Sequence, residues 1–311
     1  MTDGTRDEPQ GVPVTILNLG SINVDHVYRV PRHVAPGETL SSEGLTRGLG
    51  GKGANQSVAV ARAGGSVVHI GAVGPDADWA LDILRGVGVD TAHVARVDAP
   101  TGHAIITVDR AGENAILVHR GANGAIARDS IGAALDGAGA GDWFLAQNET
   151  SLVPDAVAMA RGRGLRVAYS AAPFEVGAVR AVLPHADLLV VNAIEASQAR
   201  DAIPGFEAAC GRLALVVTRG PEGATWRLGA EAEGWGAGTP RALDVPAPRV
   251  TPVDTTGAGD TFLGYLLAGI DGDGDVAAAM RRAARAAALQ VTRPGAIDAI
   301  PRVDELDPVS L

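Results

Sequence analysis

The chain has 311 residues, of which 46% are hydrophobic and 20% charged, as in a folded globular protein rather than a disordered one. Its formal net charge of −10 argues against a nucleic-acid partner, because neutralising a phosphate backbone requires clustered Lys and Arg. A lone cysteine, Cys210, excludes an intrachain disulfide and is typical of the reducing cytoplasm, and no apolar run reaches the roughly 20 residues that span a membrane.

Short apolar runs alternate with helical patterns along the chain, which predicts a parallel sheet with crossover helices. Residues 1–10 are polar and acidic, and we expect them to be disordered. Apolar side chains at 80, 83, 84 and 87 have helical spacing, and the Ala-rich residues 276–291 are expected to form another helix. We expect strands at residues 14–19, 67–72, 143–147, 166–169, 187–191 and 213–218.

Two stretches indicate a small second sheet. Residues 26–47 follow the first strand without a helical period, and residues 103–108 and 114–118 flank a turn-like segment, as in a hairpin. Such an appendage over an α/β site is commonly a lid, although a plain surface excursion fits the pattern equally well. We expect an α/β core made of residues 1–25, 48–100 and 120–311, and a β lid made of residues 26–47 and 101–119.

Polar side chains follow the ends of the predicted strands. They are Asn23 and Asp25, Asn148 and Glu149, Ser170, Asn192, and Thr218. One such residue alone is more often a helix cap or a turn former. Ligands of open parallel sheets, however, bind beyond the carboxyl ends of the strands. The repeated occurrence therefore marks this edge of the sheet as the candidate site.

The strongest motif is the segment 253–260, Val-Asp-Thr-Thr-Gly-Ala-Gly-Asp, followed by a predicted helix over residues 261–270. Small residues before a helix leave backbone N–H groups unobstructed, and the helix start adds positive potential, which suits a phosphoryl group. Asp260 could then accept a proton from an attacking hydroxyl, although it could also be only an N-cap. Residues 139–142 repeat the same Gly-Ala-Gly-Asp letters but run into a predicted strand, so we expect them to form a loop.

A second glycine segment, residues 48–57, has the sequence Gly-Leu-Gly-Gly-Lys-Gly-Ala-Asn-Gln-Ser. A dinucleotide-binding loop would directly follow the first strand, whereas this one follows a long excursion, which disfavours a nicotinamide-dependent oxidoreductase. Glycine lets a polyol approach the backbone closely, and Lys52 and Asn55 could hydrogen-bond it. We therefore expect a hydroxyl-rich substrate here.

Two weaker motifs lie at later strand ends. Asn192 and Glu195 have the spacing of a helix cap, but Glu195 could also position a hydrated Mg²⁺. The Gly/Pro-rich residues 218–223 could cover nucleotide phosphates or form a plain turn, with neither favoured by the pattern alone.

These four segments, in this order, resemble the ribokinase-like PfkB carbohydrate kinase family over residues 14–301, with residues 51–55 and 254–260 matching its two signatures. The resemblance implies a three-layer α/β/α fold with a mostly parallel central sheet and a small β lid. It also implies ATP-dependent phosphorylation of a sugar's primary hydroxyl, with D-ribose as the expected sugar and ribose 5-phosphate as the product. A homodimer formed through the lid is implied as well.

The family pattern also implies roles for individual positions. The implied sugar contacts are Asn23, Asp25, Gly51, Lys52, Gly53, Asn55 and Glu149, with Asp260 as the base and Gly257, Ala258 and Gly259 as the anion hole. The implied ATP contacts are Asn192, Thr218, Gly220, Gly223 and Gly259, with Mg²⁺ held through water by Glu195. The implied monovalent-cation site, for K⁺, comprises Asp254, Thr256, Gln290, Arg293, Gly295 and Ala299.

The sequence departs from the family pattern at several positions. Ser170 begins a Ser-Ala-Ala-Pro stretch where the family has Asn-Pro-Ala-Pro, Tyr265 is large where a Gly or Ala is usual, and Ala284 stands where an adenine-pocket Asn is expected. Two alternatives remain: a nucleoside kinase of the adenosine or pseudouridine type, and a non-catalytic sugar-binding regulator. The complete Gly-Gly-Lys-Gly-Ala-Asn block favours a sugar over a nucleoside, and retention of Asp260 favours an enzyme over a regulator.

Overall fold

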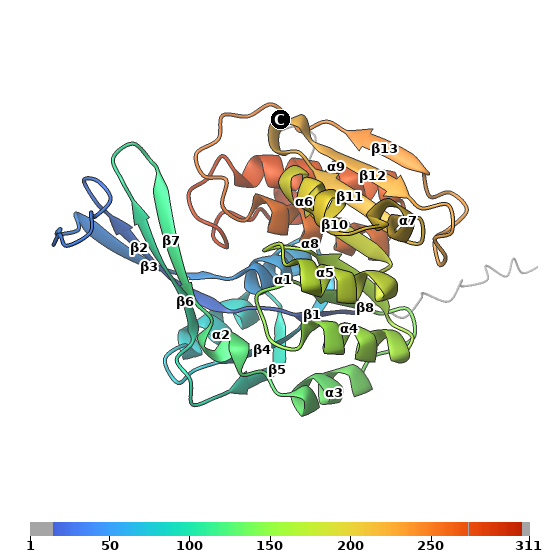
Figure 1. The fold of residues 1–311 in the computed structure, drawn as a ribbon, viewed down its shortest axis with the longest axis horizontal. Coiled ribbons are helices and arrows are strands. Elements are labelled where there is room, and N and C mark those ends of the chain that lie inside the picture. Colours follow the sequence, from blue (N-terminus) through green and yellow to red (C-terminus); the bar gives the residue numbers. More distant parts are fainter. Residues whose placement is uncertain (1–14, 273, 307–311) are drawn as a thin grey trace, which may run out of the picture.

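The computed structural model describes residues 15–272 and 274–306 (Figure 1), so the expected tail at residues 1–10 lies outside the described residues. The central sheet has nine strands, and its six predicted strands are all present. In spatial order the strands are β13 (Ala242–Val245), β12 (Ala224–Leu228), β11 (Ala214–Thr218), β10 (Leu188–Asn192), β9 (Arg166–Ser170), β8 (Trp143–Ala146), β1 (Thr15–Leu19), β4 (Ser66–Val73) and β5 (Asp90–Arg96).

All neighbouring strands from β5 to β11 are parallel, and β12 is antiparallel to both β11 and β13. Strand β1 lies between β4 and β8, and the chain continues from β1 to β4 on one side and only later to β8 on the other. Such a reversal of strand order opens a crevice at the carboxyl end of the strand where it occurs. Strand β1 therefore points at the candidate site.

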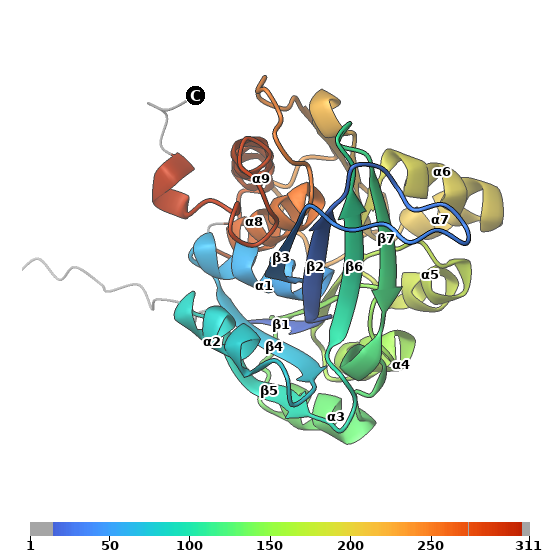
Figure 2. The same ribbon diagram turned by 90° about the vertical axis from the view of Figure 1, so that its left-hand side faces the viewer.

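Helices cover both faces of this sheet, which confirms the three-layer α/β/α architecture (Figures 1 and 2). One face carries α1 (Lys52–Arg62), α2 (Asp78–Gly86), α8 (Ala258–Gly272) and α9 (Val276–Gln290). The other face carries α3 (Arg128–Asp136), α4 (Val153–Gly162), α5 (Val176–Val182), α6 (Ala193–Ala202) and α7 (Phe206–Cys210). Short 3-10 turns are η1 (Gly121–Gly124), η2 (Leu183–His185), η3 (Gly220–Glu222) and η4 (Val303–Leu306).

The smaller sheet has four strands and projects from one side of the core (Figure 1). Its order is β3 (Gly44–Gly50), β2 (Asn23–Arg29), β6 (Gly102–Val108) and β7 (Asn114–His119). The expected hairpin is formed by β6 and β7. Strand β2 starts at Asn23, close behind β1, and β3 ends at Gly50, just before α1. The small sheet therefore brings residues 23–25 and 48–50 to the carboxyl end of β1.

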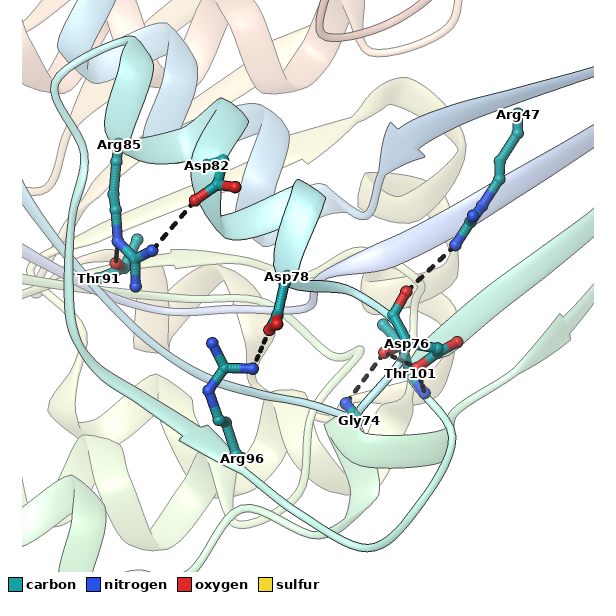
Figure 3. Close-up of polar contacts among 9 residues, drawn as sticks. All are labelled: Arg47, Gly74, Asp76, Asp78, Asp82, Arg85, Thr91, Arg96 and Thr101. Carbon is teal, nitrogen blue, oxygen red and sulfur yellow. Dashed lines mark hydrogen bonds and ion pairs between the residues drawn. The ribbon is translucent and has the colours of Figure 1, made fainter.

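The base of the small sheet is tied to the end of β4 by polar contacts (Figure 3). The Thr101 hydroxyl donates to the Asp76 carboxylate at 2.7 Å and accepts from the backbone N–H of Gly74 at 2.9 Å. From β3, the Arg47 guanidinium donates to the carbonyl of Asp76 at 3.3 Å and lies over the Trp79 ring of α2. These contacts hold the strands of the small sheet against the core.

The start of α1 packs directly on the backbone that leaves β1. A Cβ added to Gly53 would lie 2.3 Å from the Cα of Gly20 and 2.4 Å from the backbone N of Ser21. Only glycine fits such an approach, because backbone atoms on both sides have no flexible end that could move aside. The contact sets the distance between α1 and β1.

We expect Gly53→Ala to lower the free energy of unfolding by about 1–3 kcal/mol, the usual cost of forcing an extra carbon into a packed site. Urea denaturation followed by circular dichroism measures the change. The matched control is Gly86→Ala in α2, where an added Cβ meets no atom within 4 Å, so that the better helix propensity of alanine should stabilise slightly. Equal stability of Gly53→Ala and the wild type would contradict this account.

Candidate active site

Asp260 is a buried carboxylate held between two helices. It lies in the first turn of α8, which begins at Ala258, three residues before the predicted start at 261. The Asn55 Nδ2 donates to its Oδ2 at 2.9 Å, and the Gln56 Nε2 donates to its Oδ1 at 2.8 Å. Only 8% of Asp260 is exposed. Both of its carboxylate oxygens accept hydrogen bonds from side chains of α1, so they are not used to cap α8.

Opposing influences act on the pKa of Asp260. Burial raises it, while the positive charge of Lys52 and the hydrogen bonds from Asn55 and Gln56 favour the ionised form. A carboxylate in this setting is a better proton acceptor than an exposed aspartate, because its raised pKa lies closer to neutral pH. The site thus contains one base with its two oxygens already oriented.

A buried chain of polar side chains, missed by the sequence analysis, continues behind Gln56. Gln147 donates from Nε2 to the Oε1 of Gln56 at 2.7 Å and to the Oδ1 of Asn18 at 2.8 Å. Asn18 donates to the Ser57 hydroxyl, which contacts His69 Nδ1 at 2.8 Å. Because Gln56 accepts through its oxygen, its NH₂ group must face Asp260.

Burial lowers the pKa of His69 to about 4, so this end of the chain is neutral at physiological pH. All five side chains behind Asp260 are at most 1% exposed. The available sequence signal was the presence of Asn18 and Gln147 within or directly after otherwise apolar strands, where a buried amide needs partners.

Two further carboxylates lie near each other, that of Asp25 at the start of β2 and that of Glu149 after β8. Asp25 has its pKa raised to about 6, by burial and then by the negative charge of Glu149. A Cβ on Gly50 would lie 2.0 Å from the Asp25 Oδ2, so glycine at this position leaves room for the carboxylate. Nearby, the Asn23 Oδ1 accepts from Asn123 of η1 at 2.7 Å. Asn23 and Asp25 thus come from the small sheet to the edge of the large one.

Glu149 connects the same region to the start of α1. Its Oε2 accepts from the Ser21 hydroxyl at 2.5 Å and from the backbone N–H of Lys52 at 3.0 Å. Burial opposes the charge on Lys52, but the carboxylates of Asp260, Glu149 and Glu195 outweigh it and raise the pKa of Lys52. The Lys52 ammonium group therefore interacts electrostatically with three acidic side chains.

A polar cleft of about 590 Å³ opens beside Asp260. Of the implied site residues, it is lined by Lys52, Asn192, Glu195, Thr218, Gly220, Gly257, Ala258, Gly259 and Asp260. An apolar pocket of about 560 Å³ adjoins it and shares Thr218, Gly220, Ala258 and Gly259 with it. Gly223 and Ala284 line only the apolar pocket. The implied ATP contacts thus line two adjoining cavities, the polar cleft and the apolar pocket.

Asn192 and Glu195 form a capping box at the start of α6. The Asn192 Oδ1 accepts from the Glu195 N–H, and the Glu195 Oε2 accepts from the Asn192 N–H, both at 2.8 Å. Burial raises the pKa of Glu195. Among residues 15–272 and 274–306, no three His, Cys, Asp or Glu side chains cluster as a metal site, so a Mg²⁺ ion here would depend on phosphate oxygens and water.

The positions implied for a monovalent cation fall into two groups. Asp254 accepts from the N–H groups of Thr256 at 2.9 Å and Gly295 at 3.0 Å, and Gln290 donates to the Thr256 carbonyl at 2.6 Å. The buried Oε1 of Gln290 has no hydrogen-bond partner among the described residues, which fits an oxygen ligand for a cation. The Arg293 side chain instead pairs with Glu305, and the buried Ala299 could contribute only backbone atoms.

The repeated Gly-Ala-Gly-Asp tetrad at residues 139–142 lies before β8, at the opposite end of the sheet. Its Asp142 carboxylate accepts from the backbone N–H groups of Thr15 at 2.8 Å and Gly139 at 2.7 Å. The structure confirms that this copy is a loop with a local structural role. Tyr265, one of the departures from the family pattern, is fully buried and donates to the carbonyl of Pro301 at 2.7 Å, so it fills the core rather than the cleft.

Comparison with known proteins shows the family to which this chain belongs. The model of the pfkB family carbohydrate kinases matches residues 15–303. The chain is 32% identical over 301 residues to the ribokinase of Haemophilus influenzae, covering 94% of this chain and 96% of the relative. It is 30% identical over 307 residues to the deoxyribokinase of Salmonella typhi, covering 94% and 97% of the two chains.

Solved structures agree with these sequence matches. The ribokinase of Cryptococcus neoformans in complex with ADP is 29% identical, with a TM-score of 0.78 and coverage of 95% of this chain and 99% of that one. The Arabidopsis thaliana ribokinase complexed with ribose and ATP is 25% identical, with a TM-score of 0.77 and coverage of 94% and 97%. With a family match over residues 15–303, this chain belongs to the pfkB family of carbohydrate kinases, which transfer a phosphoryl group to a sugar hydroxyl.

Proposed function

We propose that this enzyme transfers the γ-phosphoryl group of ATP to the 5-hydroxyl of D-ribose, giving ribose 5-phosphate and ADP. The observation that carries the proposal is the oriented, buried carboxylate of Asp260 at the rim of a cleft that leads to a nucleotide-sized apolar pocket. Similarity to ribokinases and to a deoxyribokinase supports a pentose as the acceptor. Solved structures of two nucleoside kinases resemble this chain at 24% and 16% identity, and this similarity supports the fold alone and not a nucleoside as the acceptor.

In the proposed reaction Asp260 accepts the proton of the attacking hydroxyl as its oxygen bonds to the γ-phosphorus and the bond to ADP breaks. The N–H groups of Gly257 and Gly259, at the positive end of α8, stabilise the charge that develops on the phosphoryl oxygens. The Ala258 N–H donates to the Thr255 carbonyl at 3.3 Å, so it would first have to exchange that long bond.

For the sugar, the side chains of Asn23, Asp25, Lys52 and Asn55 provide both donors and acceptors, as adjacent hydroxyls require. Gly51 and Gly53 pack against the backbone of residues 20–23, where an added Cβ would lie 2.8 Å from the Ser21 carbonyl oxygen and 2.3 Å from the Gly20 Cα, respectively. They would therefore shape the sugar site by setting the position of α1, whose start Glu149 also holds in place. For ATP, we propose that phosphates lie over Gly257–Asp260 and near Asn192 and Lys52. The base would then enter the pocket beyond Thr218, Gly220 and Gly223.

Two ions would assist. We propose that Mg²⁺, held through water by Glu195 and directly by the phosphates, neutralises the charge of the triphosphate. A monovalent cation, K⁺, would bind at the turn formed by Asp254, Thr256, Gln290 and Gly295, with backbone oxygens of Arg293 and Ala299. Such a cation would stabilise the turn that carries Gly257, whereas proton transfer remains the role of Asp260.

We further propose a homodimer formed through the small sheet. Strand β7 is exposed along its whole length, and its Ile116, Leu117 and Val118 are 57%, 70% and 56% exposed. An unprotected apolar edge strand usually pairs with another strand.

The site of action would be the reducing cytoplasm, because Cys210 is a free thiol. None of the helices in the described part of the chain is long and apolar enough to cross a membrane.

Asp260→Asn should retain ATP binding and lose at least about a thousandfold in kcat, the scale on which loss of a catalytic proton acceptor acts. A coupled assay for ADP release with ribose measures the rate, and calorimetry measures nucleotide binding. Asp142→Asn is the matched control, because it changes the same tetrad at the far end of the sheet and should leave kcat within a few-fold. Near-normal turnover by Asp260→Asn would rule out the proposed base.

Asp25→Asn should stabilise the free enzyme at pH 7 while weakening ribose binding at least about tenfold. Since the folded pKa of Asp25 is about 6 against 3.8 unfolded, the folded state alone keeps the proton between these values. Stability therefore falls as pH rises from 4 to 6, by about 1–2 kcal/mol. Thermal melts across this range should show that fall in the wild type and a smaller one in Asp25→Asn. The exposed Glu113→Gln serves as control, and identical pH profiles for wild type and Asp25→Asn would contradict the assignment.

Light scattering at micromolar concentration should give the mass of a dimer, and Leu117→Lys should give that of a monomer, because a charge on the exposed edge opposes strand pairing. The control is Ile83→Lys, an exposed apolar residue on α2. A monomeric wild type would remove the dimer proposal without touching the catalytic one.

A further inference from the structure

The apolar pocket beside the polar cleft has an unusual lining for a site that must select one nucleobase. It has a volume of about 560 Å³ and joins the polar cleft at Thr218, Thr255 and Gly259. The cleft contains Asp260, where the γ-phosphate must react, so the pocket on the far side of this seam is left for the base. This assignment rests on the proposed function.

One wall of the pocket is a stripe of alkyl side chains on α9 and on its C-cap residue, Val291. Ala284, Ala287, Ala288 and Val291 recur at helical spacing, and all four line the pocket. Ala284 and Ala288 are only 6% and 5% exposed. An alkyl wall contributes contact area but no donor or acceptor, so this helix cannot distinguish the hydrogen-bonding edge of one base from that of another.

The opposite walls add little more. Pro221, Pro248 and Pro252 line the pocket, and a proline has no backbone N–H to offer. Phe262 adds an aromatic surface, and stacking on an aromatic ring tolerates every base, because each base has a π-face. These walls therefore favour a flat ring without selecting which ring it is.

Polar side chains are few in the lining. No Asp, Glu, Asn, Gln, Ser, Tyr or His is among the described residues that line the pocket, and Thr218 and Thr255 lie at the seam with the phosphate cleft. Arg249 is exposed, so a hydrogen bond from its guanidinium to a base would compete with water and add little preference. Adenine and guanine differ in whether position 6 donates or accepts, and the described lining contains no buried polar side chain that could read this difference.

We infer that the enzyme barely distinguishes the base of its phosphate donor and uses GTP and ITP nearly as well as ATP. A pocket that hydrogen-bonds its ligand rejects analogues by factors of about 10⁴–10⁵, whereas an apolar pocket separates isosteric ligands only by about 10²-fold or less. The specificity of the reaction then lies in the sugar site, and the donor site selects for the triphosphate.

The test has two measurements on the full-length protein. Calorimetric titration with ADP and GDP should give dissociation constants within about tenfold of each other. Ribose phosphorylation should give kcat/KM values for ATP, GTP and ITP that also agree within about tenfold. Binding of ADP more than a hundredfold tighter than GDP would overturn the inference, whether or not ribose is phosphorylated.

Two variants sharpen the result. Ala284→Asn places an amide in the alkyl wall, where it can both donate to and accept from an adenine edge, and should raise the preference for ADP over GDP at least about fivefold. Ala278→Asn, on the same helix but outside the pocket lining, should leave the ratio unchanged. An unchanged ratio in a folded Ala284→Asn variant would mean that the base lies elsewhere, which also contradicts the inference. Failure of every nucleotide to phosphorylate any sugar would instead count against the proposed function.

Discussion

The active site depends on hydrogen bonds between α1 and the Asp260 carboxylate. Asn55 and Gln56 are separated from Asp260 by 205 and 204 residues in the chain, yet their amides supply the partners that a buried carboxylate requires. The same two bonds fix the start of α8 against the start of α1. The anion-binding turn and the sugar-binding glycine segment are thereby held at a set distance from each other.

The rest of the architecture serves this junction. Gly20 and Gly53 let α1 lie directly on the backbone that leaves β1, and Gly50 leaves space for Asp25. The polar chain from Gln147 to His69 fixes the amide of Gln56 with its donor toward the base. A network of this kind tolerates little disturbance, because each buried amide that lost a partner would bear an unmet desolvation cost.

The sequence predicted those parts of the fold whose pattern is local. The six predicted strands lie inside the sheet and have apolar side chains toward both layers of helices, so they appear as continuous apolar runs. Strands β5, β12 and β13 were missed because they lie at or near the edges of the sheet, where one face is partly exposed and polar residues such as Arg227 interrupt the run.

Within the site, the motifs that depend on neighbours in sequence were predictable. The turn before α8 and the Asn192–Glu195 capping box are examples. The partners of Asp260 were only partly so: Asn55 was singled out as a sugar contact, whereas Gln56 carries no local signal. Gln147, which supports Gln56, is marked only as a polar residue after an apolar strand, and that position does not reveal which residue it bonds. Their roles arise only when α1, β8 and α8 meet, and no spacing within one segment reveals such a contact.

The most direct test of the central claim is a crystal structure of the enzyme with ribose and a non-hydrolysable ATP analogue. The account predicts that the 5-hydroxyl of ribose lies within hydrogen-bond distance, about 2.6–3.2 Å, of an Asp260 oxygen and in line with the γ-phosphorus. A sugar bound with that hydroxyl directed away from Asp260, or with another side chain in contact with it, would contradict the account.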